Sequence, residues 1–471
     1  MAVTINVTYY ATNDRYDIGE FGLSFNDSLG QMHETKLKFN MDALWAFSQD
    51  TESVAFDFLV ISMIVYNVDR AINRLQFSNV GWSRNLNVMG IPVRNLQAMN
   101  NGKSHLESAI NFLTGDVWSL NFTQAEVYDY TPDVARNYNR NEYEKVALFS
   151  GGLDSLIGFV DEAYTLSPDK RILLISHMEL GKEHNDQSKI LGHCADHGIF
   201  DGKYDQLLLN AGLKIGSWNM PTKSESTFRS RSLLFFAAGI YAAFSMGEHV
   251  NLIVPENGTI SINIPLDPGR RSSCSTRTTH PTFIKKLELA LVDMGIYNRL
   301  YNPYRLKSKA DMMIDCFRSD AKKVILEQLY DLSCSCAKRG HNFYWDKSSN
   351  EIRDGKISHC GMCLPCIYRR VALDAVGLDD AGRVGTDVFN GVRYDLNNSM
   401  QKSSRDFRAL LSFLKSRNNP VYIKQELMLN GIYERQELNE YQTLAIHSYD
   451  QVKDWINKNG SEDIKRKAGI I

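Results

Sequence analysis

Six consecutive residues carry the strongest chemical signal in this chain: Ser150, Gly151, Gly152, Leu153, Asp154 and Ser155. The apolar run 146–149 before them predicts a strand, and the apolar run 156–160 after them predicts a helix. Glycines let the backbone approach a phosphate closely, and the free N–H groups of a helix start favour negative charge. The sequence therefore predicts an anion site between a strand and a helix. A capped helix without a ligand is the simpler alternative.

The hexapeptide resembles the SGGxDS PP-loop of the ATP pyrophosphatases. It is not a Walker A loop, because no Gly-Lys-Ser/Thr follows. The resemblance implies cleavage of ATP between its α- and β-phosphates, which leaves AMP on a substrate oxygen. We expect all six residues to bind ATP, with the N–H groups around the leaving pyrophosphate and Asp154 positioning Mg²⁺ or ordering the loop.

A second signal is the run Cys-Gly-Met-Cys-Leu-Pro-Cys, which contains Cys360, Cys363 and Cys366. Two-residue gaps between thiols are typical of zinc sites, and a fourth thiolate, from Cys334 or Cys336, would complete a tetrahedron. An all-cysteine site is closed, so we expect a structural metal that does not activate water. An iron–sulfur cluster also uses four thiolates, and inert buried cysteines are the third alternative. Three other cysteines stand apart and are expected in the core: Cys194, Cys274 and Cys316.

Together the two motifs resemble QueC, the 7-cyano-7-deazaguanine synthase family, over about residues 142–380. Arg231 matches the family's GRN-type helix, although Ser232 replaces its asparagine. Pro303 and Lys309 fall at the spacing of its TP…NKAE segment. The family's SC…CGxCxxC element matches Ser333-Cys334 with the downstream cysteines, and this match makes Cys334 rather than Cys336 the fourth zinc ligand.

The resemblance implies a reaction that begins with a 7-carboxy-7-deazaguanine. Its carboxylate attacks the α-phosphorus of ATP, and an amine then attacks the acyl-adenylate. We expect Arg231 and Lys309 to act as catalytic residues that neutralise charge on the phosphates. We also expect His177, which opens the loop after the second predicted strand, to bind ATP.

The loop after the fourth predicted strand is longer and distinctive, so the substrate or the acceptor can differ from those of ordinary QueC. Glu256 and Asn257 follow the strand end and could read a guanine-like edge by hydrogen bonds, although Pro-Glu-Asn-Gly is also strong turn chemistry. We assign Arg277 and His280 to the substrate carboxylate. The family's YGQxxxxE element is replaced by residues 177–187.

A long QueC-like chain with extra ends resembles the QueC-like proteins of bacterial anti-phage operons, such as those of the Qat system and of type IV CBASS. This resemblance implies a role in defence, with either ammonia or a protein amine as acceptor. We therefore expect a deazaguanine-type substrate, a protein partner or protein substrate from a defence operon, and a homodimer as one option. The cofactors it implies are ATP, Mg²⁺ and Zn²⁺.

The predicted elements show how these residues could meet. Continuous apolar runs predict four strands, at 146–149, 171–176, 206–209 and 252–254. Helix-compatible segments, including 188–197 and 230–244, lie between them. This alternation predicts an α/β fold with a parallel sheet covered on both faces, and the resemblance makes it adenine-nucleotide alpha-hydrolase-like. Four loops follow the carboxyl ends of the strands, where such sheets bind ligands, and begin at Ser150, His177, Asn210 and Pro255.

Two regions flank this unit. Residues 1–140 predict an accessory α/β domain, with strands at 3–10 and 117–122 and helical spacing over 44–75. We expect Asp69, Arg70 and Arg74 to form a solvated ionic face. Residues 141–380 form the QueC-like domain, and a polar linker at 129–141 joins the two. Residues 381–471 predict a helical extension that could cap the site, dimerise or bind a partner.

Composition restricts the class of protein. Hydrophobic residues make up 43% and charged residues 23% of the 471 residues, as in soluble globular proteins. The net charge of −2 gives no support to nucleic-acid binding. The longest apolar stretch, 58–66, is too short to cross a bilayer and predicts a buried helix. No signal peptide begins the chain, so we expect a cytoplasmic protein without a membrane partner.

Other functions remain as alternatives. A tRNA-thiolating PP-loop enzyme needs a catalytic cysteine in the site and usually a basic RNA-binding surface. An asparagine-synthetase-type amidotransferase needs a cysteine after Met1, where Ala2 stands. A nucleotide-binding scaffold or sensor in a defence complex would keep the fold without catalysis.

Overall fold

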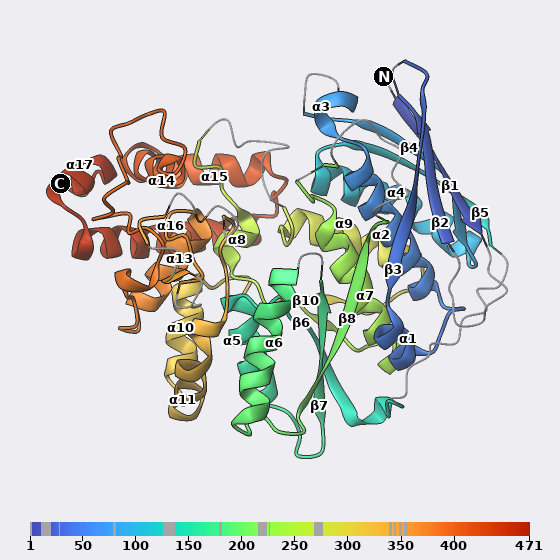
Figure 1. The fold of residues 1–471 in the computed structure, drawn as a ribbon, viewed down its shortest axis with the longest axis horizontal. Helices are drawn as coiled ribbons and strands as arrows, with labels where there is room; N and C mark the ends of the chain where they lie inside the picture. Colours follow the sequence, from blue (N-terminus) through green and yellow to red (C-terminus); the bar gives the residue numbers. More distant parts are fainter. Residues whose placement is uncertain are drawn as a thin grey trace.

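The computed structural model describes residues 2–10, 20–27, 29–78, 82–125, 137–178, 181–214, 224–225, 227–267, 277–338, 342, 345–347, 351–352 and 357–471. Cys274 and residues 129–136 of the expected linker lie outside the described residues. The described part is an α/β structure in which one long sheet carries helices on its faces (Figure 1).

Ten strands form this sheet, in the order β10-β9-β6-β7-β8-β3-β2-β1-β4-β5. Their bounds are β1 (Ala2–Tyr10), β2 (Glu20–Asn26), β3 (Met32–Asn40), β4 (Asn85–Val93), β5 (Val117–Gln124), β6 (Tyr143–Leu148), β7 (Arg171–His177), β8 (Tyr204–Leu213), β9 (Leu252–Ile253) and β10 (Leu300–Tyr301). The strands from β10 to β8 are all parallel, as are β1, β4 and β5, whereas the pairs β1–β2, β2–β3 and β3–β8 are antiparallel. The expected α/β class with a mostly parallel sheet is thus confirmed.

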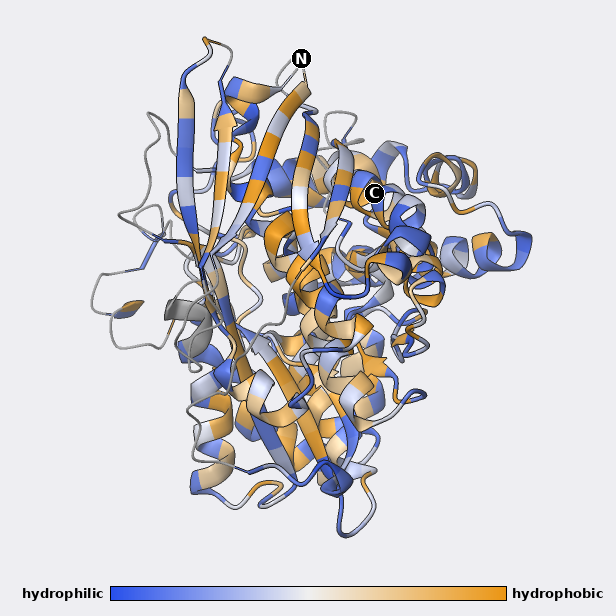
Figure 2. Cartoon of the chain, turned by 90° about the vertical axis from the view of Figure 1, so that its right-hand side faces the viewer, coloured by the Kyte–Doolittle hydropathy of each residue, from blue (hydrophilic) through white to orange (hydrophobic). Residues whose placement is uncertain are grey.

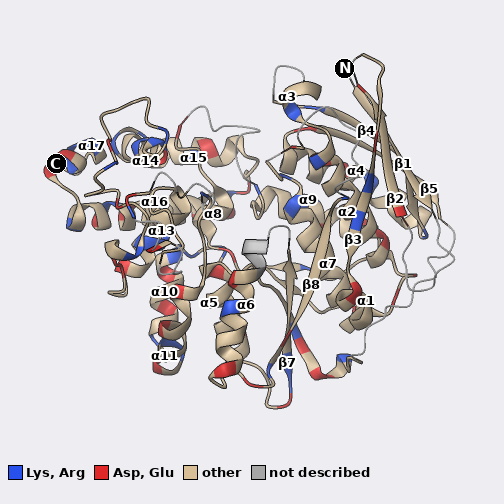
Figure 3. Ribbon diagram, viewed as in Figure 1, with Lys and Arg blue, Asp and Glu red and all other residues tan. Residues whose placement is uncertain are grey.

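The helices fall into three groups along the chain. Those before the PP-loop are α1 (Asp42–Ser48), α2 (Val54–Ala71), α3 (Arg74–Phe77) and α4 (Leu96–Thr114). Those of the central part are α5 (Leu153–Tyr164), α6 (Gly181–Asp196), α7 (Arg231–Met246), α8 (Gly258–Ile262), α9 (Pro281–Asp293), α10 (Lys309–Phe317), α11 (Asp320–Leu329) and α13 (Leu364–Asp374). Those of the C-terminal extension are α14 (Arg405–Ser416), α15 (Pro420–Leu429), α16 (Arg435–Asn459) and α17 (Glu462–Ala468). Both α10 and α11 carry acidic as well as basic residues (Figure 3).

The pleat of the central strands divides their side chains between two cores. On β7, Leu173 and Ile175 belong to a core that also contains buried residues of α2, α7 and α9, whereas Ile172 and Leu174 belong to a second core with α5, α10 and α13. Both faces of the parallel sheet are therefore covered, and this explains why its strands read as continuous apolar runs. Figure 2 shows these central strands as predominantly hydrophobic.

The first strands alternate instead, because one of their faces is exposed. The burial of β1 and β3 alternates residue by residue, and Figure 2 shows alternating colours along them. The antiparallel pairing of β3 with β8 joins them to the parallel strands, for example at Phe39 opposite Ala211. The sheet and its first core thus run across residue 140, and the second core likewise runs across residue 380 into α14 and α16. The three-domain division stays a prediction.

All six strands expected from the sequence are present, whereas β2, β3, β4 and β10 were not expected. The helical spacing over 44–75 is divided among three helices, α1 to α3. Residues 58–66 lie buried in α2 as predicted. No helix in the described parts of the chain combines the length and apolar character that crossing a membrane requires. Cys194 and Cys316 are buried in the second core, as expected.

The expectation of a solvated ionic face at the end of α2 is wrong for two of its residues. Asp69 has no exposed surface and Arg74 is only 4% exposed. Asp69 pairs with Arg84 and Arg74, and Asp116 pairs with the same two arginines. Sequence spacing did not reveal this cluster, because Arg84 and Asp116 come from distant loops. Burial raises the pKa of Asp69, but the two guanidinium groups outweigh it and hold the pKa well below its usual range.

This ionic cluster also fixes the start of α7. Asp69 Oδ2 accepts hydrogen bonds from the backbone N–H and the hydroxyl of Ser230, at 2.9 and 2.8 Å. Ser230 directly precedes Arg231, one of the expected catalytic residues. The N-terminal strands and helices therefore help to place a site residue of the central part.

Replacing Asp69 by Asn should destabilise the protein by about 3–5 kcal/mol, because two buried guanidinium groups lose a charge partner. Chemical denaturation at pH 7 measures this loss. The folded pKa of Asp69 is depressed, so its contribution is present above the unfolded pKa of about 3.9 and is lost as the pH falls below that value. Asp450→Asn, at an exposed position of α16, is the control. Equal stability of the two variants would contradict the prediction.

Candidate functional site

The PP-loop connects β6 to α5 through a tight turn. Gly151 has φ +78°, and a Cβ there would lie 3.2 Å from the Gln187 backbone nitrogen, so the turn requires glycine. The two serines of the loop fasten it: Ser150 Oγ lies 3.1 Å from Ser155 Oγ and accepts from Gly152 N at 3.3 Å. The turn thus opens the first helical turn of α5 as the sequence predicted.

Asp154 is the centre of a buried polar cluster. It lies in the first turn of α5, only 7% exposed, and its Oδ1 accepts from the Lys309 ammonium at the start of α10. Its Oδ2 accepts from Asn257 Nδ2 at 2.7 Å and from Asn257 N at 3.3 Å. Glu256 is the fourth member of this cluster. The structure therefore brings together Asp154, Glu256 and Asn257, as expected from their positions after strands, and adds Lys309 from the start of α10.

The two carboxyl groups of this cluster differ in charge. Burial alone raises the pKa of Asp154, but the Lys309 ammonium and hydrogen bonds from Glu256 and Asn257 outweigh burial and lower it. Burial and the negative charge of Asp154 raise the pKa of Glu256 well above its usual value. Asp154 is thus the carboxylate, and Glu256 keeps a proton. Such a pair of neighbouring carboxyls with opposite shifts is typical of functional sites.

Asn257 also connects the cluster to the C-terminal extension. It caps α8 by accepting from Ile260 N at 3.0 Å. A Cβ on Gly258 would lie 2.1 Å from Arg305 O and 2.5 Å from a methyl group of Leu444, so only glycine allows α8 to approach α16 this closely. The longest helix of the extension therefore packs directly behind a site residue.

His177, the last residue of β7, and Arg231, the first residue of α7, form a second group. The His177 ring packs against the rings of Tyr66 and Phe235, with centroids 5.8 and 5.2 Å away. Burial, followed by the charge of Arg231, lowers the pKa of His177 to about 3, so the ring is neutral. A backbone hydrogen bond with Ala211 raises the pKa of His177, but this effect is outweighed. Tyr66 comes from α2, and sequence reasoning missed this contribution of the N-terminal region.

Arg277 and His280 have other partners than the Asp154 cluster. Arg277 donates to Phe112 O at 2.8 Å and lies 4.3 Å from the centroid of the Phe112 ring. His280 Nδ1 accepts from Thr282 N and caps α9, and burial, followed by the charge of Arg277, lowers its pKa to about 3. Their described contacts connect α4, α9 and the extension, so their assignment to the substrate carboxylate has no support from these contacts.

Four cysteines converge beside the PP-loop, with sulfur atoms within 4.8 Å of one another. They are Cys336, Cys360, Cys363 and Cys366. The expectation that Cys334 supplies the fourth sulfur is therefore corrected, because the chain turns Cys336 into the cluster while the thiol of Cys334 faces Ser358 O at 3.8 Å. The two candidates are two residues apart, each after a serine, so the Ser-Cys signal also fitted Ser335-Cys336.

The donor set fits a tetrahedral thiolate metal. Cys360 Sγ accepts backbone N–H bonds from Met362 and Cys363 at 3.3 Å, and Cys336 Sγ accepts from Cys360 N at 3.3 Å. Hydrogen bonds from Cys336 and the other two cysteines lower the pKa of Cys363 well below its usual value. Four sulfur atoms within 4.8 Å of one another are the donor set of a tetrahedral zinc site, and a divalent cation such as zinc would allow all four to bind as thiolates.

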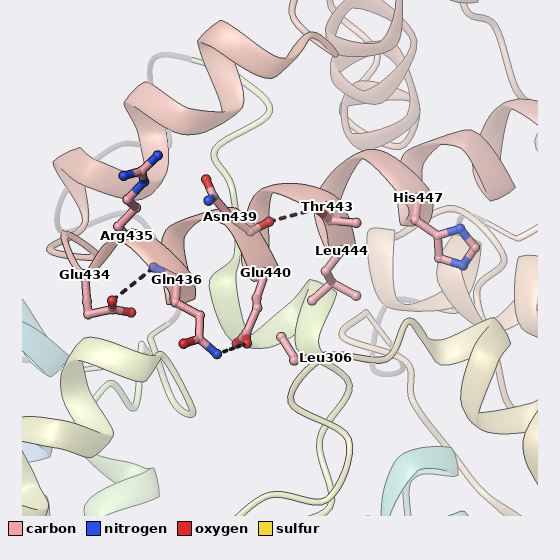
Figure 4. A pocket seen from close by; sticks show the side chains of 9 residues that line it. All are labelled: Leu306, Glu434, Arg435, Gln436, Asn439, Glu440, Thr443, Leu444 and His447. Atoms are coloured by element: carbon pink, nitrogen blue, oxygen red, sulfur yellow. Dashed lines mark hydrogen bonds between the residues drawn. The ribbon is translucent and has the colours of Figure 1, made fainter.

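A pocket of about 760 Å³ lies outside these groups on the extension. Figure 4 shows its wall, made by one side of α16 with Gln436, Glu440 and Leu444 facing Leu306. Leu306 stands three residues before Lys309. The extension thus adds an open surface of polar and apolar residues next to the segment that precedes α10 and its site residue Lys309.

No protein-family model matches this chain, and no curated protein or solved structure matches it either. The chemistry assigned below therefore rests on the residues and their geometry.

Replacing Glu256 by Gln should change how stability depends on pH. The folded pKa of Glu256 is raised, so wild-type stability from this group is complete below the unfolded pKa of about 4.3 and is lost as the pH rises. Glutamine keeps the neutral shape without this loss. Melting temperatures between about pH 5 and 8 should therefore fall less steeply in E256Q than in wild type. Parallel curves would contradict the protonated state of Glu256.

Replacing Cys336 by Ser should remove bound metal and lower the melting temperature, because one of four sulfur ligands is lost. Cys334→Ser is the matched control, since it makes the same change two residues away and should keep the metal. Metal content measured by mass spectrometry separates the two. Metal loss in C334S but not in C336S would restore the original assignment of the fourth ligand.

Proposed function

We propose that this chain is an ATP-dependent ligase that adenylates a carboxylate of the 7-carboxy-7-deazaguanine type and transfers the acyl group to an amine. The observation that supports this proposal is the buried pair of Asp154 and Lys309. It places an ammonium group beside the first turn of α5, where the SGGxDS loop offers its N–H groups. Charge of both signs at a phosphate-type loop suits a reaction in which a pyrophosphate leaves.

The proposed reaction has two steps. A carboxylate oxygen attacks the α-phosphorus of ATP, and the bond from this phosphorus to the bridging oxygen of the β-phosphate breaks. Lys309 and the N-terminal end of α5 stabilise the charge on the leaving pyrophosphate. The amine nitrogen then attacks the acyl carbon and loses a proton, and AMP leaves. Carboxylates acylate amines poorly, and adenylation supplies the missing leaving group.

The other residues position the reactants. Asp154 is the carboxylate that would position Mg²⁺ or order the loop, and Mg²⁺ neutralises phosphate charge when bound. Asn257 fixes the Asp154 carboxylate by two hydrogen bonds. Arg231 and the neutral ring of His177 line the neighbouring strand end, where ATP or the substrate base would contact them. Zinc at the cysteine cluster would have a structural role.

The acceptor is ammonia or a protein amine. The resemblance to QueC-like proteins of anti-phage operons favours a protein from the same operon, and with it a role in bacterial defence. Ammonia would give an amide and, after a second activation, a nitrile. A protein amine would give a deazaguanine–protein conjugate. The open surface formed by α16 and Leu306 offers room for a partner next to the start of α10, which carries Lys309.

A thiolating PP-loop enzyme is the second candidate, and one observation favours it. Cys334 stands outside the metal cluster, and its backbone N–H donates to Gly151 O at 2.9 Å. A cysteine next to the PP-loop is what a persulfide mechanism requires. In that case Cys334→Ser would abolish sulfur transfer, whereas the ligase proposal does not require the thiol.

Asp154→Asn should lower pyrophosphate release by about 100-fold or more, because the variant loses a charge that orders Lys309 and the loop. The assay contains ATP, Mg²⁺ and 7-carboxy-7-deazaguanine, with and without ammonia, and mass spectrometry identifies the products. Asp450→Asn on the exposed face of α16 is the control and should retain full turnover.

The products of this assay distinguish between the possible acceptors and between an enzyme and a scaffold. Pyrophosphate, AMP and a nitrile support ordinary QueC chemistry, whereas pyrophosphate with an acyl-adenylate and no nitrile supports another acceptor. No pyrophosphate from the folded wild-type protein would contradict the proposal in favour of a non-catalytic scaffold. Normal turnover in D154N would contradict the assignment of the site.

A further inference from the structure

A short segment, Cys334–Cys336, connects the metal cluster to the PP-loop, and we call it the strap. Its first residue donates from its backbone to Gly151 O at 2.9 Å. Its second residue, Ser335, accepts from Leu153 N through Oγ at 3.2 Å. Its third residue, Cys336, supplies a sulfur to the cluster. One residue therefore separates the metal site from the N–H group that opens α5.

The strap lies directly against the loop. A Cβ built on Gly152 would be 3.7 Å from both Cys334 O and Ser335 Oγ, which is ordinary van der Waals contact. The backbone N–H of Ser335 donates to His359 Nε2 at 3.2 Å, and His359 directly precedes the cluster residue Cys360. The side chain of Ser335 is thus held by the loop, and its backbone N–H is held by the segment that carries the cysteines.

The hydroxyl of Ser335 has unused hydrogen-bonding capacity. A serine hydroxyl has one donor and two acceptor positions. Ser335 Oγ accepts from Leu153 N, and its own hydrogen has no acceptor among the residues that the structure describes. The side chain is partly exposed at the start of α5, so this hydrogen is available to an anion on the loop.

We propose that Ser335 is a further phosphate-binding residue of the PP-loop, and that a metal ion in the cysteine cluster holds it in place through Cys336. The ligand is the pyrophosphate portion of a nucleoside triphosphate, and this identity rests on the proposed function. The metal thereby sets nucleotide affinity without touching the nucleotide. Without the metal, the sulfur of Cys336 keeps only weak contacts such as the N–H of Cys360, and the strap is held less firmly.

The resulting role of Ser335 is one of binding and positioning, and it is specific to the triphosphate. Its hydroxyl donates to an oxygen of the leaving pyrophosphate while Leu153 N donates to the hydroxyl. A hydrogen bond to a charged acceptor contributes more than a neutral one. AMP lacks the pyrophosphate, so the affinity for AMP should not depend on Ser335.

Calorimetric titration of the full chain with MgATP and with AMP tests this role. Ser335→Ala should weaken MgATP binding about tenfold and leave AMP binding unchanged. Ser416→Ala removes a hydroxyl from the distant helix α14 and is the control for both nucleotides. Removal of the metal with a chelator should weaken MgATP binding of the wild type to a similar extent, and zinc chloride should restore it. Unchanged MgATP affinity in S335A, or an equal loss for AMP, would overturn the proposal.

Amide hydrogen exchange without nucleotide tests the mechanical part separately. Exchange at residues 151–155 should become faster in S335A and in the metal-depleted wild type, and exchange in α16 should not change. Unchanged exchange at the loop after metal removal would overturn the role of the metal. Failure of the folded wild type to bind any MgATP would instead contradict the proposed function, and the exchange data would still decide whether the metal holds the strap.

Discussion

The ion pair between Asp154 and Lys309 is the constraint on which the rest of the site depends. Both side chains are less than a tenth exposed, so each would be costly to bury alone. The pair forms only where the start of α5 meets the start of α10, and Asn257 from the end of β9 completes the hydrogen bonds of the carboxylate. The starts of α5 and α10 and the segment after β9 must therefore pack together, because the buried charge of Asp154 needs partners from both of the other elements.

The N-terminal and C-terminal regions each hold elements that carry site residues. On one side, the buried cluster around Asp69 holds Ser230 and with it the first turn of α7. On the other side, α16 holds the two elements that carry Asn257 and Lys309: Thr259 Oγ1 lies 2.7 Å from Ser448 Oγ, and Ser308 Oγ donates to Gln451 at 2.6 Å. The described hydrogen bonds and ion pairs of the Asp154 cluster come from the central part of the chain. Both terminal regions fix the helix starts on which the site residues stand.

The sequence predicted the central part well because its signals are local. Continuous apolar runs marked β6, β7, β8 and β9, and the residues at the strand ends converged as parallel strands require. Pairings between residues far apart in the chain could not be predicted from the sequence. Nothing near Asp69 reveals that Arg84 and Asp116 bury it, and nothing near β3 shows that it pairs with β8. The fourth cysteine was missed for a different reason: Ser333-Cys334 and Ser335-Cys336 give the same signal, and only the path of the chain distinguishes them.

The PP-loop lies between the Asp154–Lys309 ion pair and the cysteine cluster. These two neighbours differ in whether they need a metal ion to balance their charge. The buried ion pair on one side is complete within the chain, because each charge has its partner. The cysteine cluster on the other side is complete only with a cation, since four crowded sulfurs cannot all be charged without one. A glycine-rich turn has little rigidity of its own. The order of the loop therefore follows from its two neighbours, and the one built from cysteines depends on the metal ion that its four sulfurs would hold.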